Sequence, residues 1–291
     1  MDQRKIPKIL KELSKVSSYL LFILVGIVMG ILWQRYYGVH QFLLDIGIRT
    51  IEFSDSQTRI KKDISTLKQP FVILIAGQSN VANTVSSLSK SSPNIYNFYD
   101  SALYHAQDPL LGATGKQGSL WIEVGEQLLA KTNYSEVVII NIARNNSSIS
   151  DWINNGEFNN LIIQTHNSAV LYGLKPDVLL WGQGERDALD NMRKSDYQKM
   201  LTNFVNNTNK EAQSMPIIIS LSSRCFSNTE NTNIRHAQME TIKRFNFVFQ
   251  GPDTDKLGTV YRYDDCHFNT QGKEINSMLW TKYIINALPS S

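Results

Sequence analysis

The chain has 291 residues, with 29 Lys and Arg against 26 Asp and Glu, a formal net charge of +3. Five of the basic and two of the acidic residues fall within residues 1–15, and subtracting them leaves 24 of each sign, so the rest of the chain is formally neutral. This balance excludes a basic nucleic-acid surface. The acidic residues do not form the alternating ligand loop of a calcium site, and no other metal-ligand pattern is present.

The amino-terminal segment predicts a membrane anchor. Residues 16–33 are eighteen residues without a charge, which span about 27 Å as a helix, close to a bilayer's hydrocarbon core. The basic residues 1–15 precede this span, so the positive-inside rule places them in the cytoplasm and the rest of the chain on the periplasmic or extracellular side. A cleaved signal peptide is the alternative, but it needs a small-residue cleavage site, whereas Trp33, Tyr36 and Tyr37 follow here. We therefore expect a single-pass signal anchor.

Residues 34–69 are polar and charged with scattered apolar positions, which predicts a stalk or linker. A structured part of the following domain is the alternative. Pro70 marks the entry to a predicted catalytic domain over residues 70–291, which is long enough for one full hydrophobic core.

Apolar runs alternate with helical patterns through this domain. The runs predict strands at residues 71–76, 137–142, 177–181 and 215–221. The helical patterns cover residues 158–172, 195–213, 233–247 and 271–288. Strands separated by helices favour a three-layer α/β/α domain with a central parallel sheet, whose ligand crevice lies at the carboxyl ends of the strands.

The segment Gly77-Gln78-Ser79-Asn80 directly follows the first predicted strand. Gly77 tolerates a sharp turn, and a helix expected to begin here would point its amino-terminal amides at the Ser79 hydroxyl. Serine and asparagine are also common in turns and helix caps, so the motif needs a base elsewhere in the chain. With such a base, Ser79 is the candidate nucleophile.

The candidate base lies near the carboxyl terminus, where Asp264 precedes His267 by three residues in a short loop. This spacing lets one turn aim both side chains at one point. Asp264 would orient the imidazole of His267, which would deprotonate Ser79. A solvated surface histidine is the alternative for His267 taken alone.

A third polar segment, Trp181 to Ala188, follows the predicted strand 177–181. The side-chain amide of Gln183 would donate to the oxyanion of a tetrahedral intermediate. Glu185 would brace the histidine or the loop.

These three segments resemble the sequence blocks of the SGNH hydrolase superfamily. They are most similar to its sialate O-acetylesterase and carbohydrate esterase family 6 branch, which carries Gln-Gly-Glu in the third block. Residues 147–152 and 251–255 also fit that branch, and the resemblance spans roughly residues 70–288. It implies a flavodoxin-like fold in which Ser79, His267 and Asp264 form the triad, with Asn80 and Glu185 in support.

The resemblance also implies an oxyanion hole made by the amide of Ser79, a glycine amide and Gln183. Gly118 matches the glycine of the second block best, with Gly112 and Gly115 as alternatives.

Around this site, the resemblance and the aromatic and polar loop residues suggest a sugar-binding rim of Ser148, Trp152 and Tyr263. Two positions depart from the family pattern: Gly182 stands where relatives often carry histidine, and Arg186 replaces a commoner small residue. Both departures bear on substrate preference rather than on the chemistry.

Cys225 and Cys266 are the only cysteines. The predicted topology places both outside the cytoplasm, where disulfides persist. Cys225 follows a predicted strand end and Cys266 directly precedes His267, so we predict a disulfide that fixes the histidine loop. Two buried free thiols are the alternative.

Together these features predict a membrane-anchored serine esterase that removes O-acetyl groups from a carbohydrate, either sialic acid or a polysaccharide. It would use an acyl-enzyme intermediate and neither metal nor cofactor, and its partners would be the acetylated sugar and the membrane. The acetylated sugar is implied by the resemblance alone. One alternative is a glycan O-acetyltransferase with the same triad, and the other is a membrane-tethered glycan-binding module with a vestigial triad. Residue spacing carries no signal for the oligomeric state.

Overall fold

The computed structural model describes residues 26–29, 53–90, 92–154, 156–212, 215–226 and 229–287. The chain divides into two compact units, Met1–Thr50 and Ile51–Ser291, and the second is described below. Within the described ranges, no helix combines the length and the apolar character needed to cross a bilayer. The predicted anchor at residues 16–33 lies outside these ranges, apart from the helical residues 26–29.

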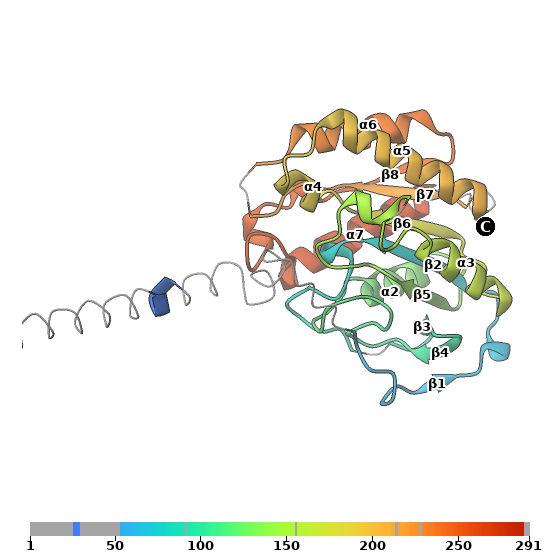
Figure 1. The fold of residues 1–291 in the computed structure, drawn as a ribbon. Helices are drawn as coiled ribbons and strands as arrows, with labels where there is room; N and C mark the ends of the chain where they lie inside the picture. Colours follow the sequence, from blue (N-terminus) through green and yellow to red (C-terminus); the bar gives the residue numbers. More distant parts are fainter. Residues whose placement is uncertain are drawn as a thin grey trace, which may run out of the picture. The chain divides into compact units, whose positions relative to one another are not determined.

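An eight-stranded sheet forms the centre of the second unit, with strand order β1-β4-β3-β5-β2-β6-β7-β8 (Figure 1). The strands are β1 (Lys61–Lys62), β2 (Phe71–Gly77), β3 (Ile95–Tyr99), β4 (Ala102–His105), β5 (Val137–Asn141), β6 (Val178–Gly182), β7 (Ile217–Leu221) and β8 (Val248–Asp253). In this spatial order, every pair of neighbouring strands between β3 and β8 is parallel. After β2 the chain builds one half of the sheet and then crosses to the other side at β6, so the crevice expected at a topological switch point lies at the carboxyl end of β2.

Helices cover both faces of the sheet. They are α2 (Trp121–Lys131), α3 (Leu161–Leu171), α4 (Glu185–Leu189), α5 (Lys194–Glu211), α6 (Thr232–Arg244) and α7 (Thr270–Ala287). Odd-numbered side chains of β2 from Phe71 to Ile75 pack in one cluster with α2 and α7, whereas even-numbered ones from Val72 to Ala76 pack with α3, α5 and α6. Burial on both faces explains why this strand is a continuous apolar run. The α/β fold with a central, mostly parallel sheet is therefore confirmed.

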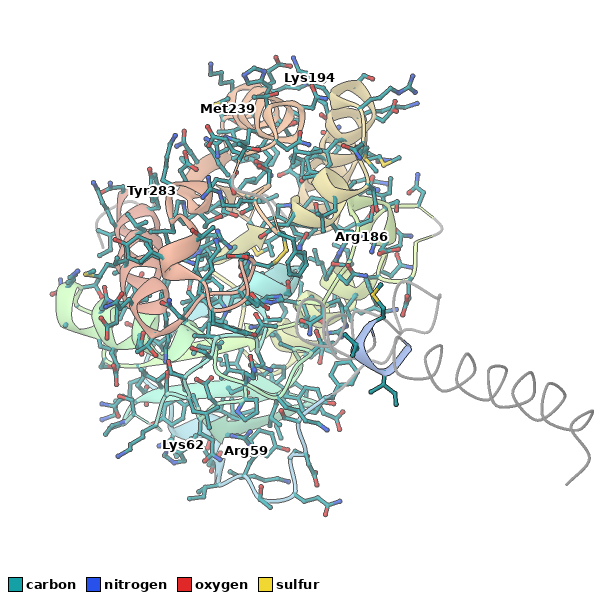
Figure 2. The ribbon with its side chains drawn as sticks, turned by 90° about the vertical axis from the view of Figure 1, so that its left-hand side faces the viewer. Arg59, Lys62, Arg186, Lys194, Met239 and Tyr283 are labelled. Atoms are coloured by element: carbon teal, nitrogen blue, oxygen red, sulfur yellow. A yellow bond between two sulfur atoms is a disulfide. The ribbon has the colours of Figure 1, made fainter. Side chains whose placement is uncertain are left out.

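The sheet differs from the prediction at its edges. β4 pairs antiparallel with β3 and with β1, so the sheet is not wholly parallel. In Figure 2, Lys62 of β1 marks this edge, while Lys194 of α5 and Met239 of α6 lie at the opposite end of the molecule. The prediction missed these strands because the β3–β4 turn uses Asp100 and Ser101 at positive φ instead of the usual Asn-Gly signal.

β8 was also missed, and its sequence explains why. It contains Gly251-Pro252, and proline is normally excluded from strand interiors because it cannot donate to the ladder. β8 is the last strand of the sheet, so one of its edges makes no pairing and the proline is tolerated there.

Residues 53–69, expected in the stalk, belong to the folded unit, as the alternative interpretation allowed. β1 pairs with β4, and Phe53 forms an isolated bridge with Thr114. The rest of the predicted stalk, residues 34–52, lies outside the described ranges.

The chain turns sharply at Gly77, as predicted. Its φ is +128°, and a Cβ atom there would lie 2.0 Å from the carbonyl oxygen of Gly182 on the neighbouring strand. The amide of Gln78 donates to that same oxygen at 2.8 Å. The end of β2 and the end of β6 thus touch through backbone alone.

The prediction of a helix after Ser79 is wrong. Only one 3-10 turn, η2 (Ser79–Val81), forms, and the backbone is extended again at Ala82. The amide of Asn83 is drawn away to the carbonyl of Thr114 at 3.0 Å, which ends the turn. The other 3-10 turns are η1 (Ile64–Thr66), η3 (Ile149–Trp152), η4 (Thr254–Lys256) and η5 (Thr259–Tyr261).

The predicted disulfide is present. Cys225 and Cys266 are bonded, with Cα atoms 4.1 Å apart, and both are at most 5% exposed. The bond joins the loop after β7 to the residue before His267.

We expect Gly77→Ala to lower the free energy of unfolding of the full-length protein by more than about 3 kcal/mol, because the new Cβ would meet Gly182 in addition to the strained φ. Gly173→Ala is the matched control, since Gly173 also has positive φ, +75°, but nothing within 4 Å of a Cβ. It should cost only the backbone strain, about 1–2 kcal/mol. Urea unfolding measures both, and equal losses would contradict the proposed contact.

The disulfide should stabilise the folded state substantially, because it closes a loop of 41 residues. We expect the double variant Cys225→Ser/Cys266→Ser to lose about 4 kcal/mol in urea unfolding. Reductant should lower the stability of the wild type toward that of the variant and leave the variant unchanged. A wild type as stable as the double variant under oxidising conditions would refute this role.

Candidate active site

Ser79, the predicted nucleophile, opens the η2 turn at the carboxyl end of β2 and is 6% exposed. Its carbonyl accepts hydrogen bonds from the Thr84 hydroxyl at 2.6 Å and the Ala82 amide at 2.9 Å, which fix the turn. As the first residue of the turn, its own amide has no acceptor within the turn. The Ser79 hydroxyl makes no hydrogen bond to any described residue.

Asp264 and His267 are brought together as predicted. Nδ1 of His267 lies 2.7 Å from Oδ2 of Asp264, and Oδ1 accepts the amides of Cys266 at 3.0 Å and His267 at 2.6 Å. Burial alone would raise the pKa of Asp264, but the hydrogen bonds from the imidazole and the two amides hold that pKa below its ordinary value. An ionised Asp264 binds the Nδ1–H tautomer, so Nε2 is left to accept a proton.

Arg262 holds the histidine loop from inside. Its guanidinium donates to the carbonyls of Leu257 at 3.1 Å and Thr254 at 2.9 Å and also to that of Cys266, and it lies 4.4 Å from the centre of the Phe268 ring. Burial lowers the pKa of Arg262, while nearby Glu185 and Asp255 oppose the shift. Sequence reasoning missed Arg262, because nothing in its neighbourhood marks it as buried.

The histidine loop packs against the segment that follows Ser79. The Ser86 amide donates to the Phe268 carbonyl at 3.2 Å, and the Tyr263 hydroxyl donates to the Thr84 carbonyl at 3.2 Å. The Tyr263 ring lies against the His267 ring with centroids 6.0 Å apart. The histidine loop therefore lies beside the segment that follows Ser79.

No hydrogen bond joins the Ser79 hydroxyl to His267 within the described structure. Hydrogen bonds between a nucleophile and its base are often long in an unliganded site and tighten when substrate binds.

Gln183 is not arranged as an oxyanion donor, contrary to the prediction. It is fully buried, and its amide nitrogen donates to the Ser147 carbonyl at 3.1 Å and to the carboxylate of Asp187. Its side-chain oxygen accepts the Tyr197 hydroxyl at 2.9 Å. Both donors are engaged beneath the site, so Gln183 fixes the loop that carries it.

Gly118 is also unsuitable as an oxyanion donor. Its amide donates to the Val85 carbonyl at 2.9 Å, and the Val85 amide donates back at 2.8 Å. Of the alternatives, Gly115 is partly exposed, approaches the backbone of Asn83, and donates its amide to no described group. Gly112 is buried against Asn141. Neither Gly112 nor Gly115 donates its amide to a described group, and Gly115 is the more exposed of the two.

Asn80 and Glu185 connect the first block, Gly77 to Asn80, with the third block, Gln183 to Glu185. The Asn80 amide donates to Glu185 at 2.9 Å, and both side chains are buried. Burial raises the pKa of Glu185, and the hydrogen bond from Asn80 opposes the shift. Gln78 adds a second link, because its side-chain oxygen accepts the amides of Gly184 at 3.2 Å and Arg186 at 3.1 Å. Of the two roles predicted for Glu185, the structure supports bracing of the loop.

Asp187 is a buried residue to which sequence reasoning gave no role. Its carboxylate accepts the Ser148 hydroxyl at 2.6 Å and the Ile149 amide at 3.0 Å, in addition to Gln183. Burial raises the pKa of Asp187, while these hydrogen bonds oppose the shift. Asp187 follows Gln183 by four residues at the start of α4, and this spacing is the sequence feature that could have predicted their contact. Ser148, predicted for the substrate rim, is held by this carboxylate.

Trp152 does not belong to a substrate rim. It is 3% exposed, its indole donates to the Ser147 hydroxyl at 2.9 Å, and its ring packs 5.3 Å from that of Trp181. Its role is therefore in the core. Tyr263 is 44% exposed beside His267, and its place in a substrate rim stays a prediction.

The two departures from the family pattern have local explanations. A Cβ atom at Gly182 would lie 2.4 Å from Cγ1 of Val81, so Val81 fills the space that a side chain at position 182 needs. Arg186 donates to Asp190 at 2.7 Å and to Asn146 at 3.1 Å, and Figure 2 shows it at the molecular surface. It links the third block to the loop after β5.

One acidic cluster, Glu230, Asp253 and Asp255, has the ligand spacing of a cation site. Arg235 occupies its centre, forming ion pairs with all three carboxylates at 3.2, 2.7 and 3.0 Å. The arginine offsets part of the negative charge of the cluster and links Asp253 and Asp255 to α6.

Comparison with solved structures supports the fold. The chain is similar to a protein from Arabidopsis thaliana (TM-score 0.61, 16% identity, 75% of this chain and 100% of that chain) and to NanS (TM-score 0.54, 13% identity, 76% and 98%). It is also similar to a carbohydrate acetylesterase from Xanthomonas citri (TM-score 0.50, 14% identity), covering 72% of this chain and 54% of that chain. At these identities the likeness concerns the fold alone.

No curated protein matches the chain. Residues 69–284 match the family model described as carbohydrate esterase, sialic acid-specific acetylesterase. This match covers most of the chain and coincides with the described sheet and helices. The chain therefore belongs to this family of carbohydrate acetylesterases and is a carboxylic ester hydrolase.

Proposed function

We propose that this protein removes O-acetyl groups from a carbohydrate by means of a Ser79-His267-Asp264 triad. The observation that carries the proposal is the Asp264–His267 pair at 2.7 Å, in a loop packed against the residues that follow Ser79. The acetyl ester and the carbohydrate are inferred as the substrate from family membership.

The mechanism begins with attack of the Ser79 oxygen on the ester carbonyl while Nε2 of His267 takes the hydroxyl proton. Asp264 stabilises the resulting imidazolium. The amides of Ser79 and Gly115 donate to the oxyanion. The intermediate then collapses, and the sugar hydroxyl leaves with the proton from His267.

Water completes the cycle. It attacks the acetyl group on Ser79 as His267 takes one of its protons, and collapse of the second intermediate returns that proton to the Ser79 oxygen and releases acetate. Tyr263, exposed beside His267, offers an aromatic edge for the sugar.

Membrane attachment is the second part of the proposal. It rests on the sequence, since residues 16–33 are long and apolar enough to cross a bilayer and follow a basic segment. The esterase domain would then act outside the cytoplasm, which agrees with the disulfide between Cys225 and Cys266.

Substitution of the triad should abolish acetate release from an O-acetylated N-acetylneuraminic acid by the full-length protein. We expect Ser79→Ala, His267→Ala and Asp264→Asn each to lower kcat by about 10³-fold or more. Asp265→Asn is the matched control, because Asp265 is an adjacent exposed carboxylate whose φ of +64° asparagine tolerates. Its rate should stay within about twofold of the wild type.

Equal rates in the wild type and the triad variants would disprove the proposed triad. If the wild type consumes the ester only when an acceptor sugar is added, the acyl-enzyme is resolved by transfer and not by water.

Carbonate extraction and external protease test the anchor. Full-length protein should remain in the membrane fraction, and protease added from outside the cytoplasm should digest the catalytic domain while sparing an amino-terminal tag. Leu24→Arg puts a charge in the apolar span at a cost of about 3 kcal/mol and should release protein from the membrane. Leu88→Arg, at a residue 63% exposed on the folded unit, should leave retention unchanged. Complete extraction of the wild type would rule out an integral anchor.

A further inference from the structure

Two adjoining hollows open at the carboxyl ends of β3 and β5. Their volumes are about 230 and 590 Å³, and both are lined by Arg144, Leu161 and Gln164. The smaller is also lined by Gly112, Asn141 and Asp100, and the larger by Phe53 and Glu157. The predicted triad does not account for this space.

Arg144, which lines both hollows, is hydrogen-bonded to the end of the strand that precedes Ser79. The amide of Arg144 donates to the carbonyl of Gly77 at 2.9 Å, and Gly77 precedes Ser79 by two residues. β5 is the direct neighbour of β2, and paired strands are about 4.8 Å apart. The loop that carries Arg144 and the turn that carries Ser79 therefore leave neighbouring strands at the same end of the sheet.

Backbone carbonyls fix one end of the Arg144 guanidinium. Nη1 donates to the carbonyls of Gly112 at 2.7 Å, Ile142 at 2.9 Å and Ala143 at 3.2 Å. Nε and Nη2 have no acceptor among the described residues, and within that part of the chain Arg144 forms no ion pair. Three N–H donors of a side chain that lines both hollows thus have no acceptor within the described part of the chain.

Two aromatic rings flank the same guanidinium. Its Cζ lies 4.8 Å from the centre of the Phe53 ring and 5.7 Å from that of Phe158. These rings confine its motion and keep water from its faces. The group is therefore preorganised before any ligand binds, which lowers the entropic cost of binding.

No described carboxylate forms an ion pair with Arg144, although Glu157 lines the same hollow. Burial lowers the pKa of Arg144 to about 10, while Tyr99 and Glu157 oppose the shift, so the group stays positive at neutral pH. A largely desolvated arginine with unused donors is the arrangement that binds a carboxylate through two parallel hydrogen bonds. Gln164, Thr165 and Ser168 add amide and hydroxyl groups along the smaller hollow.

We propose that Arg144 is a specificity-determining residue that binds the carboxylate of an acidic sugar while Ser79 attacks the acetyl ester on that same sugar. The inference rests on the proposed function, because it assigns the second recognition point of the same substrate. Neutral acetylated sugars would lack this contact and bind more weakly.

Competition on the wild-type protein tests the carboxylate without any substitution. Hydrolysis of 4-nitrophenyl acetate is measured with N-acetylneuraminate, its neutral methyl ester or galacturonate as inhibitor. We expect N-acetylneuraminate to inhibit at least about tenfold more strongly than the methyl ester. Equal inhibition by galacturonate would support recognition of sugar carboxylates in general. Equal inhibition by the acid and its methyl ester would overturn the inference.

A substitution then assigns the contact to Arg144. The readout is the ratio of kcat/KM for an O-acetylated N-acetylneuraminic acid to that for its methyl ester. Arg144→Met keeps the apolar stem and should lower this ratio about tenfold to a hundredfold, mainly through KM. Arg193→Met, at a side chain 81% exposed, is the matched control and should leave the ratio unchanged. An unchanged ratio in Arg144→Met would also overturn the inference.

Binding without turnover separates this inference from the proposed function. Calorimetry with N-acetylneuraminate on Ser79→Ala and on Ser79→Ala/Arg144→Met needs no catalysis. Loss of binding in the double variant supports the Arg144 site even if the wild type hydrolyses nothing, whereas equal binding by both proteins refutes it even if the esterase is active.

Discussion

The contact between Gly77 and Gly182 determines how the predicted active site is assembled. With no side chain on either residue, the ends of β2 and β6 approach closely enough for the Gln78 amide to donate to the Gly182 carbonyl at 2.8 Å. The first and third blocks therefore leave the sheet side by side. The contacts from Gln78 to Gly184 and from Asn80 to Glu185 depend on this starting point, because a Cβ atom at Gly77 would push the strands apart.

Buried polar groups then fix each loop in place. Glu185 and Asp187 sit under the first and third blocks, and Arg262 sits under the histidine loop, each bound to backbone or side-chain partners. Such groups are costly to bury unless they are hydrogen-bonded, so each favours one loop conformation over others. The disulfide adds a covalent link beside His267. These buried contacts fix the loops that carry Ser79 and the Asp264–His267 pair, although no hydrogen bond joins Ser79 to His267 within the described residues.

The site also shows how a family pattern changes without loss of the fold. Where relatives often carry a side chain, Gly182 has none, and Val81 occupies the space from the neighbouring turn. Arg186 replaces a small residue and reaches Asn146 in the next loop. Neither Gly182 nor Arg186 contacts the Asp264–His267 pair by a hydrogen bond within the described residues. The fold is preserved in relatives of 13–16% identity, because packing constrains the pattern of buried positions more than the residues themselves.

The sequence by itself determined the features of this protein that depend on residues close together in the chain. The buried strands are continuous apolar runs, Asp264 and His267 are three residues apart, and Cys266 is adjacent to the histidine, so short-range geometry sufficed. Tertiary structure alone decided which donors remain free, because the partners come from distant segments. The Gly118 amide is taken by Val85, 33 positions earlier in the chain, the Gln183 amide by a carbonyl 36 residues away, and Trp152 is buried by Trp181. For Arg144, the Gly112 carbonyl and the rings of Phe53 and Phe158 come from distant parts of the chain, whereas Ile142 and Ala143 are its neighbours.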